Sequence, residues 1–117
     1  MKRLKEISVA IILTIIVLFA TGSDQPPNTI TIVAKRFAFT PDRVTVKKGE
    51  PVTLSLQSAD VVHGLAIKEL GIKTDIPKGR ETVITFTPQS AGTFEGKCSH
   101  FCGLGHGSMK FRVIVTE

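Results

Sequence analysis

Four side chains of the types that bind metals lie within a twelve-residue segment near the end of the chain. They are Cys98, Cys102, His106 and Met109, with the spacing C-x3-C-x3-H-x2-M. Thiolate and thioether sulfur are soft ligands that suit copper, whereas imidazole suits copper and zinc alike. A structural zinc site is built from Cys and His pairs and has no use for Met. The segment therefore predicts a copper site.

The second cysteine bears on the number of metal ions. A mononuclear blue copper site uses one Cys, two His and a weak axial Met. Cys98 and Cys102 together supply one thiolate more than that site needs. Two neighbouring thiolates can each bridge two metal ions, which predicts two coppers that share both sulfurs. In an exported protein two Cys also form disulfides, and this is the alternative state of the metal-free chain.

A further ligand is expected from another part of the fold. His63 lies in the sequence Asp-Val-Val-His-Gly-Leu at residues 60–65, between two strand-like runs. A lone His in such a place is often a core histidine with satisfied hydrogen bonds. The chain has three His, however, and the other two, His100 and His106, lie in the cysteine segment. His63 is therefore predicted to be a copper ligand.

Strand-like runs must hold these ligands in place. From residue 29 onward, short runs of alternating apolar and polar residues are separated by turn residues, and no helical periodicity is found. The runs lie at residues 29–34, 44–46, 52–56, 65–67 and 84–86, around Phe94, and at 111–115. Seven or eight strands at this spacing predict an all-β sandwich or barrel with antiparallel connections. The cysteine segment joins the last two runs, so both of its ends would be held by a sheet.

The N-terminal segment has the pattern of an export signal. Lys2, Arg3 and Lys5 precede an almost wholly apolar run from residue 7 to residue 20. That run is shorter than the ~20 residues of a membrane span and fits the ~7–15 residues of a signal-peptide core. We expect a signal peptide or membrane-anchor helix at residues 1–22, a linker at 23–28 and one domain at 29–117. Either outcome places the domain outside the cytoplasm, in the periplasm or on the outer face of the cell membrane.

The charge distribution bears on the kind of partner. The formal net charge is +5, but part of the surplus lies in the first five residues. Beyond residue 22 the basic residues are scattered, and no basic stripe is interleaved with aromatic residues. We therefore expect no nucleic-acid partner. No nucleophile–base pair and no phosphate-binding Gly loop indicates a hydrolytic activity.

Taken together, the motifs resemble the CuA domain of cytochrome c oxidase subunit II and of nitrous oxide reductase. The shared segments are residues 60–64, 86–88, 91–94 and 98–109, and the similarity spans about residues 37–117. The chain is most similar to subunit II of the ba3-like oxidases, which have a single N-terminal membrane helix. The resemblance implies a cupredoxin-like Greek-key β-sandwich, in agreement with the strand pattern.

The resemblance also implies a role for each ligand position. Cys98 and Cys102 would bridge both coppers; His63 and Met109 would bind one copper; His106 would bind the other, with the main-chain carbonyl of His100 as a weak axial ligand. Two features of the sequence depart from the family. His100 stands where the family often has a carboxylate that helps to hold magnesium. The chain has no Trp or Tyr, so electron entry would run through Phe101 or the edge of His106.

The implied function is one-electron transfer from a cytochrome c or another donor to subunit I of a terminal oxidase. The chain would not be catalytic alone, because oxygen chemistry needs a haem partner. Its positive charge does not offer the acidic patch that docks a cationic cytochrome c. The alternatives are a stand-alone extracytoplasmic electron carrier, a copper-delivery protein and a disulfide-stapled interaction domain without metal. A closed and complete ligand set favours electron transfer over delivery.

Overall fold

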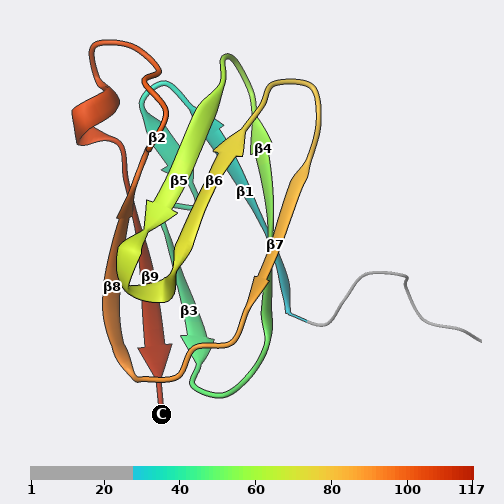
Figure 1. Ribbon diagram of the computed structural model, residues 1–117, viewed down its shortest axis with the longest axis vertical. Helices are drawn as coiled ribbons and strands as arrows, with labels where there is room; N and C mark the ends of the chain where they lie inside the picture. Colours follow the sequence, from blue (N-terminus) through green and yellow to red (C-terminus); the bar gives the residue numbers. More distant parts are fainter. Residues whose placement is uncertain (1–27) are drawn as a thin grey trace, which may run out of the picture.

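The computed structural model describes residues 28–117, which form two β-sheets packed face to face (Figure 1). The four-stranded sheet has the order β2-β1-β4-β7 and the five-stranded sheet the order β3-β9-β8-β5-β6. The strands are β1 (Thr29–Lys35), β2 (Ala38–Thr40), β3 (Arg43–Lys47), β4 (Val52–Ser58), β5 (His63–Ile67), β6 (Ile72–Ile76), β7 (Thr82–Phe86), β8 (Gly92–Lys97) and β9 (Lys110–Thr116). The helical turns of this region are two short 3-10 segments, η3 (Lys68–Leu70) and η4 (His106–Ser108). The all-β prediction is confirmed.

The predicted signal or anchor segment, and all but the last residue of the predicted linker, lie outside the described residues. Within residues 28–117, no helix is long and apolar enough to cross a membrane.

Two strands were not predicted, and the expected antiparallel connections are only partly correct. β2 is three residues long, and β6 has only two apolar residues, Ile72 and Ile76, with Thr74 between them on the same face. β1 pairs in parallel with β4, and β3 pairs in parallel with β9. Between β1 and β4, and again between β3 and β9, the chain crosses to the other sheet and back. Such crossovers allow neighbouring strands to run parallel.

The core lies between the two sheets and follows the predicted alternation. Leu54 and Leu56 of β4 and Phe111 and Val113 of β9 are fully buried. The ring of Phe111 also packs edge-on against the ring of Phe39, with 5.8 Å between centroids. The predicted metal-binding cysteines belong to the same buried cluster. The candidate site is therefore one end of the hydrophobic core and not a surface attachment.

Gly96 allows β8 to approach β5 closely beside this site. A Cβ at Gly96 would lie 2.6 Å from Ile67 Cγ1 and 3.0 Å from the Ala66 carbonyl oxygen. These distances are shorter than ordinary van der Waals contact, so any side chain would push the two strands apart. β8 leads directly into the cysteine segment, and its pairing with β5 holds that segment next to His63.

We expect the substitution Gly96→Ala to lower the free energy of unfolding of the metal-free protein by about 1–3 kcal/mol, as overpacking does. Urea unfolding followed by circular dichroism measures this change. Gly107→Ala is the matched control, since a Cβ there meets no atom within 4 Å. Equal stability of the two variants would contradict the close approach at Gly96.

Candidate metal centre

The cysteine segment forms a loop at the end of the sandwich opposite the C-terminus (Figure 1). Cys98 follows the last residue of β8, and Met109 precedes the first residue of β9. The base of the loop is closed by a hydrogen bond from the Cys98 N–H to the Met109 carbonyl oxygen, at 3.1 Å. His63 is the first residue of β5. Three strands of the same sheet therefore fix the positions from which these side chains extend.

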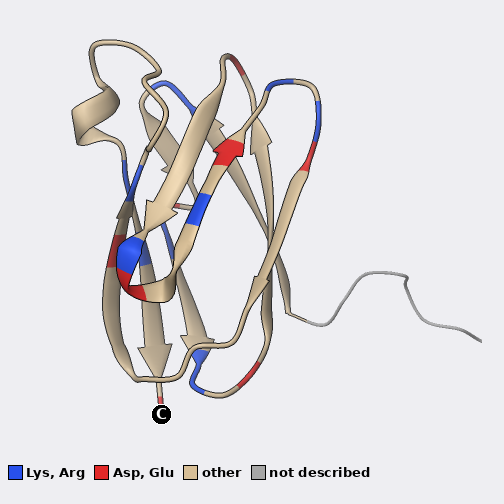
Figure 2. Cartoon of the chain, viewed as in Figure 1, with Lys and Arg blue, Asp and Glu red and all other residues tan. Residues whose placement is uncertain are grey.

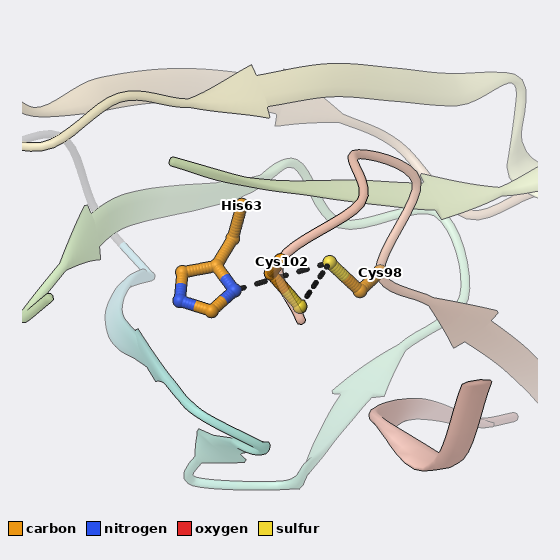
Figure 3. A group of neighbouring side chains, drawn as sticks. All are labelled: His63, Cys98 and Cys102. Carbon is orange, nitrogen blue, oxygen red and sulfur yellow. Dashed lines mark hydrogen bonds between the residues drawn. The ribbon is translucent and has the colours of Figure 1, made fainter. Parts of the chain in front are cut away.

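His63, Cys98 and Cys102 form a compact buried cluster (Figure 3). Their ligand atoms all lie within 4.8 Å of one another. The two sulfurs are 3.6 Å apart, and His63 Nδ1 lies 3.9 Å from Cys98 Sγ. The structure thus brings the distant histidine next to the two cysteines.

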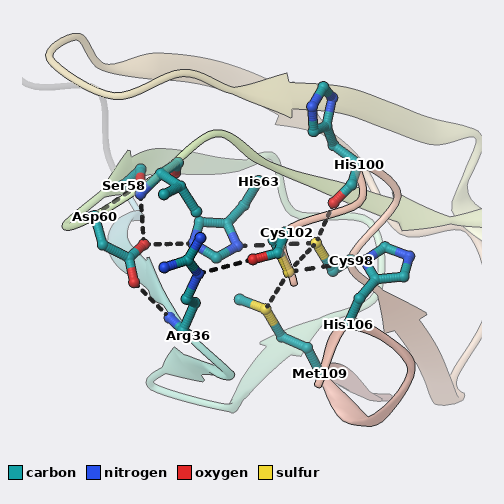
Figure 4. Close-up of polar contacts among 10 residues, drawn as sticks. Arg36, Ser58, Asp60, His63, Cys98, His100, Cys102, His106 and Met109 are labelled. Atoms are coloured by element: carbon teal, nitrogen blue, oxygen red, sulfur yellow. Dashed lines mark hydrogen bonds and ion pairs between the residues drawn. The ribbon is translucent and has the colours of Figure 1, made fainter. Parts of the chain in front are cut away.

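The other two side chains of the motif lie on the Cys102 side of the cluster. His106 Nδ1 is 3.7 Å from Cys102 Sγ, and Met109 Sδ is 3.9 Å from the same sulfur (Figure 4). Around a metal with bonds of about 2.3 Å to sulfur and about 2.0 Å to nitrogen, tetrahedral neighbours lie about 3.5–3.8 Å apart. The spacing of the donor atoms and their soft chemistry therefore fit copper.

His100 is placed differently from the other two histidines. Its carbonyl oxygen lies 3.1 Å from Cys98 Sγ and accepts a hydrogen bond from that thiol. Its imidazole points away from the sulfurs (Figure 4), with Nδ1 3.6 Å from Asp75 Oδ1 at the surface. His100 can therefore offer its main-chain oxygen to a metal, while its side chain takes no part in the cluster.

Asp60 orients His63, a role that the sequence pattern alone did not reveal. Asp60 Oδ1 lies 2.7 Å from His63 Nε2 (Figure 4). Burial raises the pKa of the Asp60 carboxyl, but hydrogen bonds from the Arg36 N–H, His63 and the Val61 N–H outweigh burial and hold that pKa well below its usual range. An ionised carboxylate only accepts hydrogen bonds, so Nε2 carries the proton and Nδ1 is free to bind metal. A carboxylate three residues before a suspected ligand was the available sequence signal.

Arg36, between β1 and β2, ties both ligand regions together. Its main-chain N–H donates to Asp60 Oδ2 at 2.9 Å, and its Nε–H donates to the Cys102 carbonyl oxygen at 2.8 Å. Arg36 is 66 positions from Cys102 in the sequence, and nothing in its local pattern marks it. Only the folded chain reveals that one arginine links the His63 segment to the cysteine loop.

The next residue, Phe37, packs against the glycines of the loop. A Cβ at Gly105 would lie 2.4 Å from the Phe37 ring, and one at Gly103 would lie 3.0 Å from it. Gly103 also has a φ of 135°, which side chains rarely adopt. These two glycines allow the ring to lie flat against the loop, which limits the ways in which the loop can move.

Burial governs the protonation of Cys102 in the metal-free protein. Burial, together with the neighbouring Cys98, raises the pKa of the Cys102 thiol to about 11. The positive charge of Arg36 opposes this shift without overcoming it. Cys102 is therefore a protonated thiol at neutral pH, and a metal ion must displace its proton to bind the sulfur.

Truncation of Asp60 tests its role in orienting His63. We expect Asp60→Ala to weaken Cu(I) affinity by about 10- to 100-fold, because the histidine loses the acceptor that sets its tautomer. Competition with a chromophoric Cu(I) chelator measures the affinity. Asp75→Ala is the matched control, because Asp75 contacts only the outward His100 imidazole at the site. Equal losses in both variants would show that Asp60 acts through overall charge.

Copper affinity should also depend on pH in a defined direction. Protons compete with copper for Cys102 below its pKa of about 11, so Cu(I) affinity should rise with pH by at least about tenfold per unit between about pH 7 and about pH 9. The same chelator competition, repeated across this range, gives the slope. In Cys102→Ser the logarithm of the affinity should rise by about one unit less per pH unit, because one proton fewer is displaced. An affinity of the unmodified chain that does not change with pH would contradict proton displacement from Cys102.

The sequence of this chain matches a known protein family. The sequence profile of the cupredoxin-like domain matches residues 8–115. Cytochrome c oxidase subunit 2 of Thermus thermophilus is 28% identical over 97 residues, which cover 83% of this chain and 70% of that protein.

Two solved structures show related folds. The periplasmic domain of subunit II of cytochrome oxidase of Bradyrhizobium japonicum superposes with a TM-score of 0.73 at 23% identity, covering 80% of this chain and 86% of that one. The Cu(I)-bound metal binding domain of the Cu(I) exporting P-type ATPase of Streptococcus pneumoniae D39 gives a TM-score of 0.64 at 26% identity, covering 81% of this chain and 93% of that one. With a family profile matched over nearly its whole length and a two-sheet β fold, the chain belongs to the cupredoxin-like domain family.

Proposed function

We propose that the chain is a copper-binding electron-transfer protein with a dinuclear, CuA-type centre. The observation that carries this proposal is a pair of buried thiols whose sulfurs are 3.6 Å apart, each within 4 Å of a different histidine nitrogen. A mononuclear site would leave one of these thiols without a role. The proposed donors are His63, Cys98, Cys102, His106, Met109 and the main-chain carbonyl of His100.

The surroundings of these donors suit fast electron transfer. Bound copper would supply a one-electron couple, and the protein would keep the ligand positions nearly unchanged between the two redox states. Cys98, Cys102, Met109 and His63 are all less than 5% exposed, so little water would rearrange around them. Both ends of the loop continue into strands, which restrains the donors further.

We further propose that this domain serves as subunit II, or a subunit II-like module, of a terminal oxidase. The similarity to the Thermus thermophilus subunit supports this assignment. Electrons would arrive from a cytochrome c or another donor and leave to subunit I, where the oxygen chemistry would take place. The domain would not be catalytic by itself.

The proposed division of the chain follows from this role. Residues 1–22 would be a signal peptide or membrane anchor, residues 23–28 a linker, and residues 29–117 the copper domain on the outer side of the membrane. The fold similarity to a domain described as periplasmic supports an extracytoplasmic location. A stand-alone carrier with the same site would require the same export.

Copper delivery is the second candidate function. One structural neighbour is the metal binding domain of a Cu(I) exporting ATPase, with Cu(I) bound. A delivery site would hold one Cu(I) and release it readily to an acceptor protein. The second thiol and the buried ligands of this chain favour the electron-transfer proposal over delivery.

Copper content and electron paramagnetic resonance of the reconstituted protein test the proposal. We expect two coppers per chain and a hyperfine pattern from one unpaired electron shared equally by two copper nuclei. Cys98→Ser and Cys102→Ser should each abolish that pattern, because each removes a bridging sulfur, whereas Ser99→Ala should keep it. One copper with a single-nucleus hyperfine pattern in the unmodified chain would instead support delivery or a mononuclear centre.

A further inference from the structure

A groove of about 880 Å³ opens beside the candidate metal centre. It runs over the outer side of the five-stranded sheet, where β5, β6, β8 and η3 meet the cysteine loop. Cys98 and His106 line it at the metal end. A molecule seated in this groove would therefore lie beside the proposed copper ligands.

All charged side chains that line the groove are lysines: Lys68, Lys73 and Lys97. Lys97 and Lys73 lie in one row across the sheet, because both are Cα partners of Ala66, on opposite sides of β5. The small side chain of Ala66 leaves the space between them open. The basic bands on β6, on η3 and at the loop end of β8 are visible in Figure 2.

These lysines are not neutralised within the described part of the chain. Among residues 28–117, none of the three has an ion-pair partner. Of the carboxylates close by in the sequence, Glu95 pairs with Lys110, Asp75 Oδ1 lies 3.6 Å from His100 Nδ1, and Glu69, which follows Lys68, does not line the groove. Clustered like charges repel one another, and an anionic partner would relieve that repulsion.

The cysteine loop also carries exposed apolar side chains near His106. Phe101 is 71% exposed, with its ring centroid 5.7 Å from that of His106, and Leu104 is 101% exposed. Protein interfaces commonly combine an apolar centre with a polar or charged rim. The apolar tip and the basic groove together form such a surface around the proposed copper ligand His106.

We propose that this surface docks an acidic electron-donor protein, whose carboxylates enter the lysine groove while its apolar patch covers Phe101 and Leu104. This inference rests on the proposed electron-transfer function and names its partner. The donor cofactor would lose one electron and the copper centre would gain it, with no bond made or broken. Cationic donors would be disfavoured by the same lysines.

Binding of a strongly acidic redox protein to the metal-free chain tests docking independently of copper. The probe is the soluble domain of cytochrome b5, and the basic mitochondrial cytochrome c is the comparison. We expect cytochrome b5 to bind with a Kd that weakens by about tenfold or more between about 20 mM and about 200 mM NaCl, and cytochrome c not to bind. Amide shifts in the nuclear magnetic resonance spectrum should centre on Lys68, Lys73 and Lys97.

A pair of charge-reversal variants separates this groove from overall charge. Lys68→Glu with Lys97→Glu should weaken cytochrome b5 binding by about tenfold or more. Lys47→Glu with Lys48→Glu changes the net charge equally at the end of β3, opposite the metal loop (Figure 1), and should leave the Kd within about twofold. Equal effects of the two pairs, or amide shifts elsewhere, would overturn the proposal. So would inorganic phosphate producing the same shifts, because the groove would then be a small-anion site.

Copper reconstitution of the same samples keeps the two proposals apart. If cytochrome b5 docks in the groove but copper gives no dinuclear signal, the proposed copper function fails and the acidic-partner surface stands. If copper gives the dinuclear signal but cytochrome b5 does not dock, only the partner assignment fails. With both present, electron transfer from reduced cytochrome b5 should slow by about tenfold or more in the Lys68→Glu, Lys97→Glu variant.

Discussion

The close approach of two buried cysteine sulfurs is the constraint on which the metal end of this structure depends. Cys98 and Cys102 are four residues apart, and their sulfurs are held 3.6 Å apart inside the core. Burial and the neighbouring Cys98 disfavour the thiolate form of Cys102 and raise its pKa. A soft metal cation that binds both sulfurs would reverse this unfavourable electrostatics. The loop, its glycines and the strands at its ends all serve to keep the two sulfurs at this distance.

The second feature is a hydrogen-bond network that joins three separate parts of the chain. Asp60 holds His63 in one tautomer, and Arg36 binds both the Asp60 carboxylate and the Cys102 carbonyl. The turn after β1, the segment before β5 and the cysteine loop are therefore coupled. Because the donor atoms come from distant segments, their relative positions depend on this coupling as much as on the sheet.

The surface around the site combines exposed apolar side chains with a basic groove. Phe101 and Leu104 of the loop are exposed to solvent, and three lysines line the groove beside the loop. The exposed side chains of β1 and β7 in the four-stranded sheet are mainly uncharged, such as Thr31, Val83 and Thr85. Charge is thus concentrated on the sheet that carries the cysteine loop, where a redox partner would have to approach.

The sequence by itself determined the all-β class, most of the strands and the side chains that meet at the site. Alternation reveals a strand because its side chains point to opposite faces, and the C-x3-C-x3-H-x2-M spacing places four donors in one loop. Only the tertiary structure decided the parallel pairings, the strand β6, the outward turn of the His100 imidazole and the roles of Asp60 and Arg36. These features depend on contacts between residues far apart in the chain, and local patterns carry no record of which distant residue becomes a neighbour.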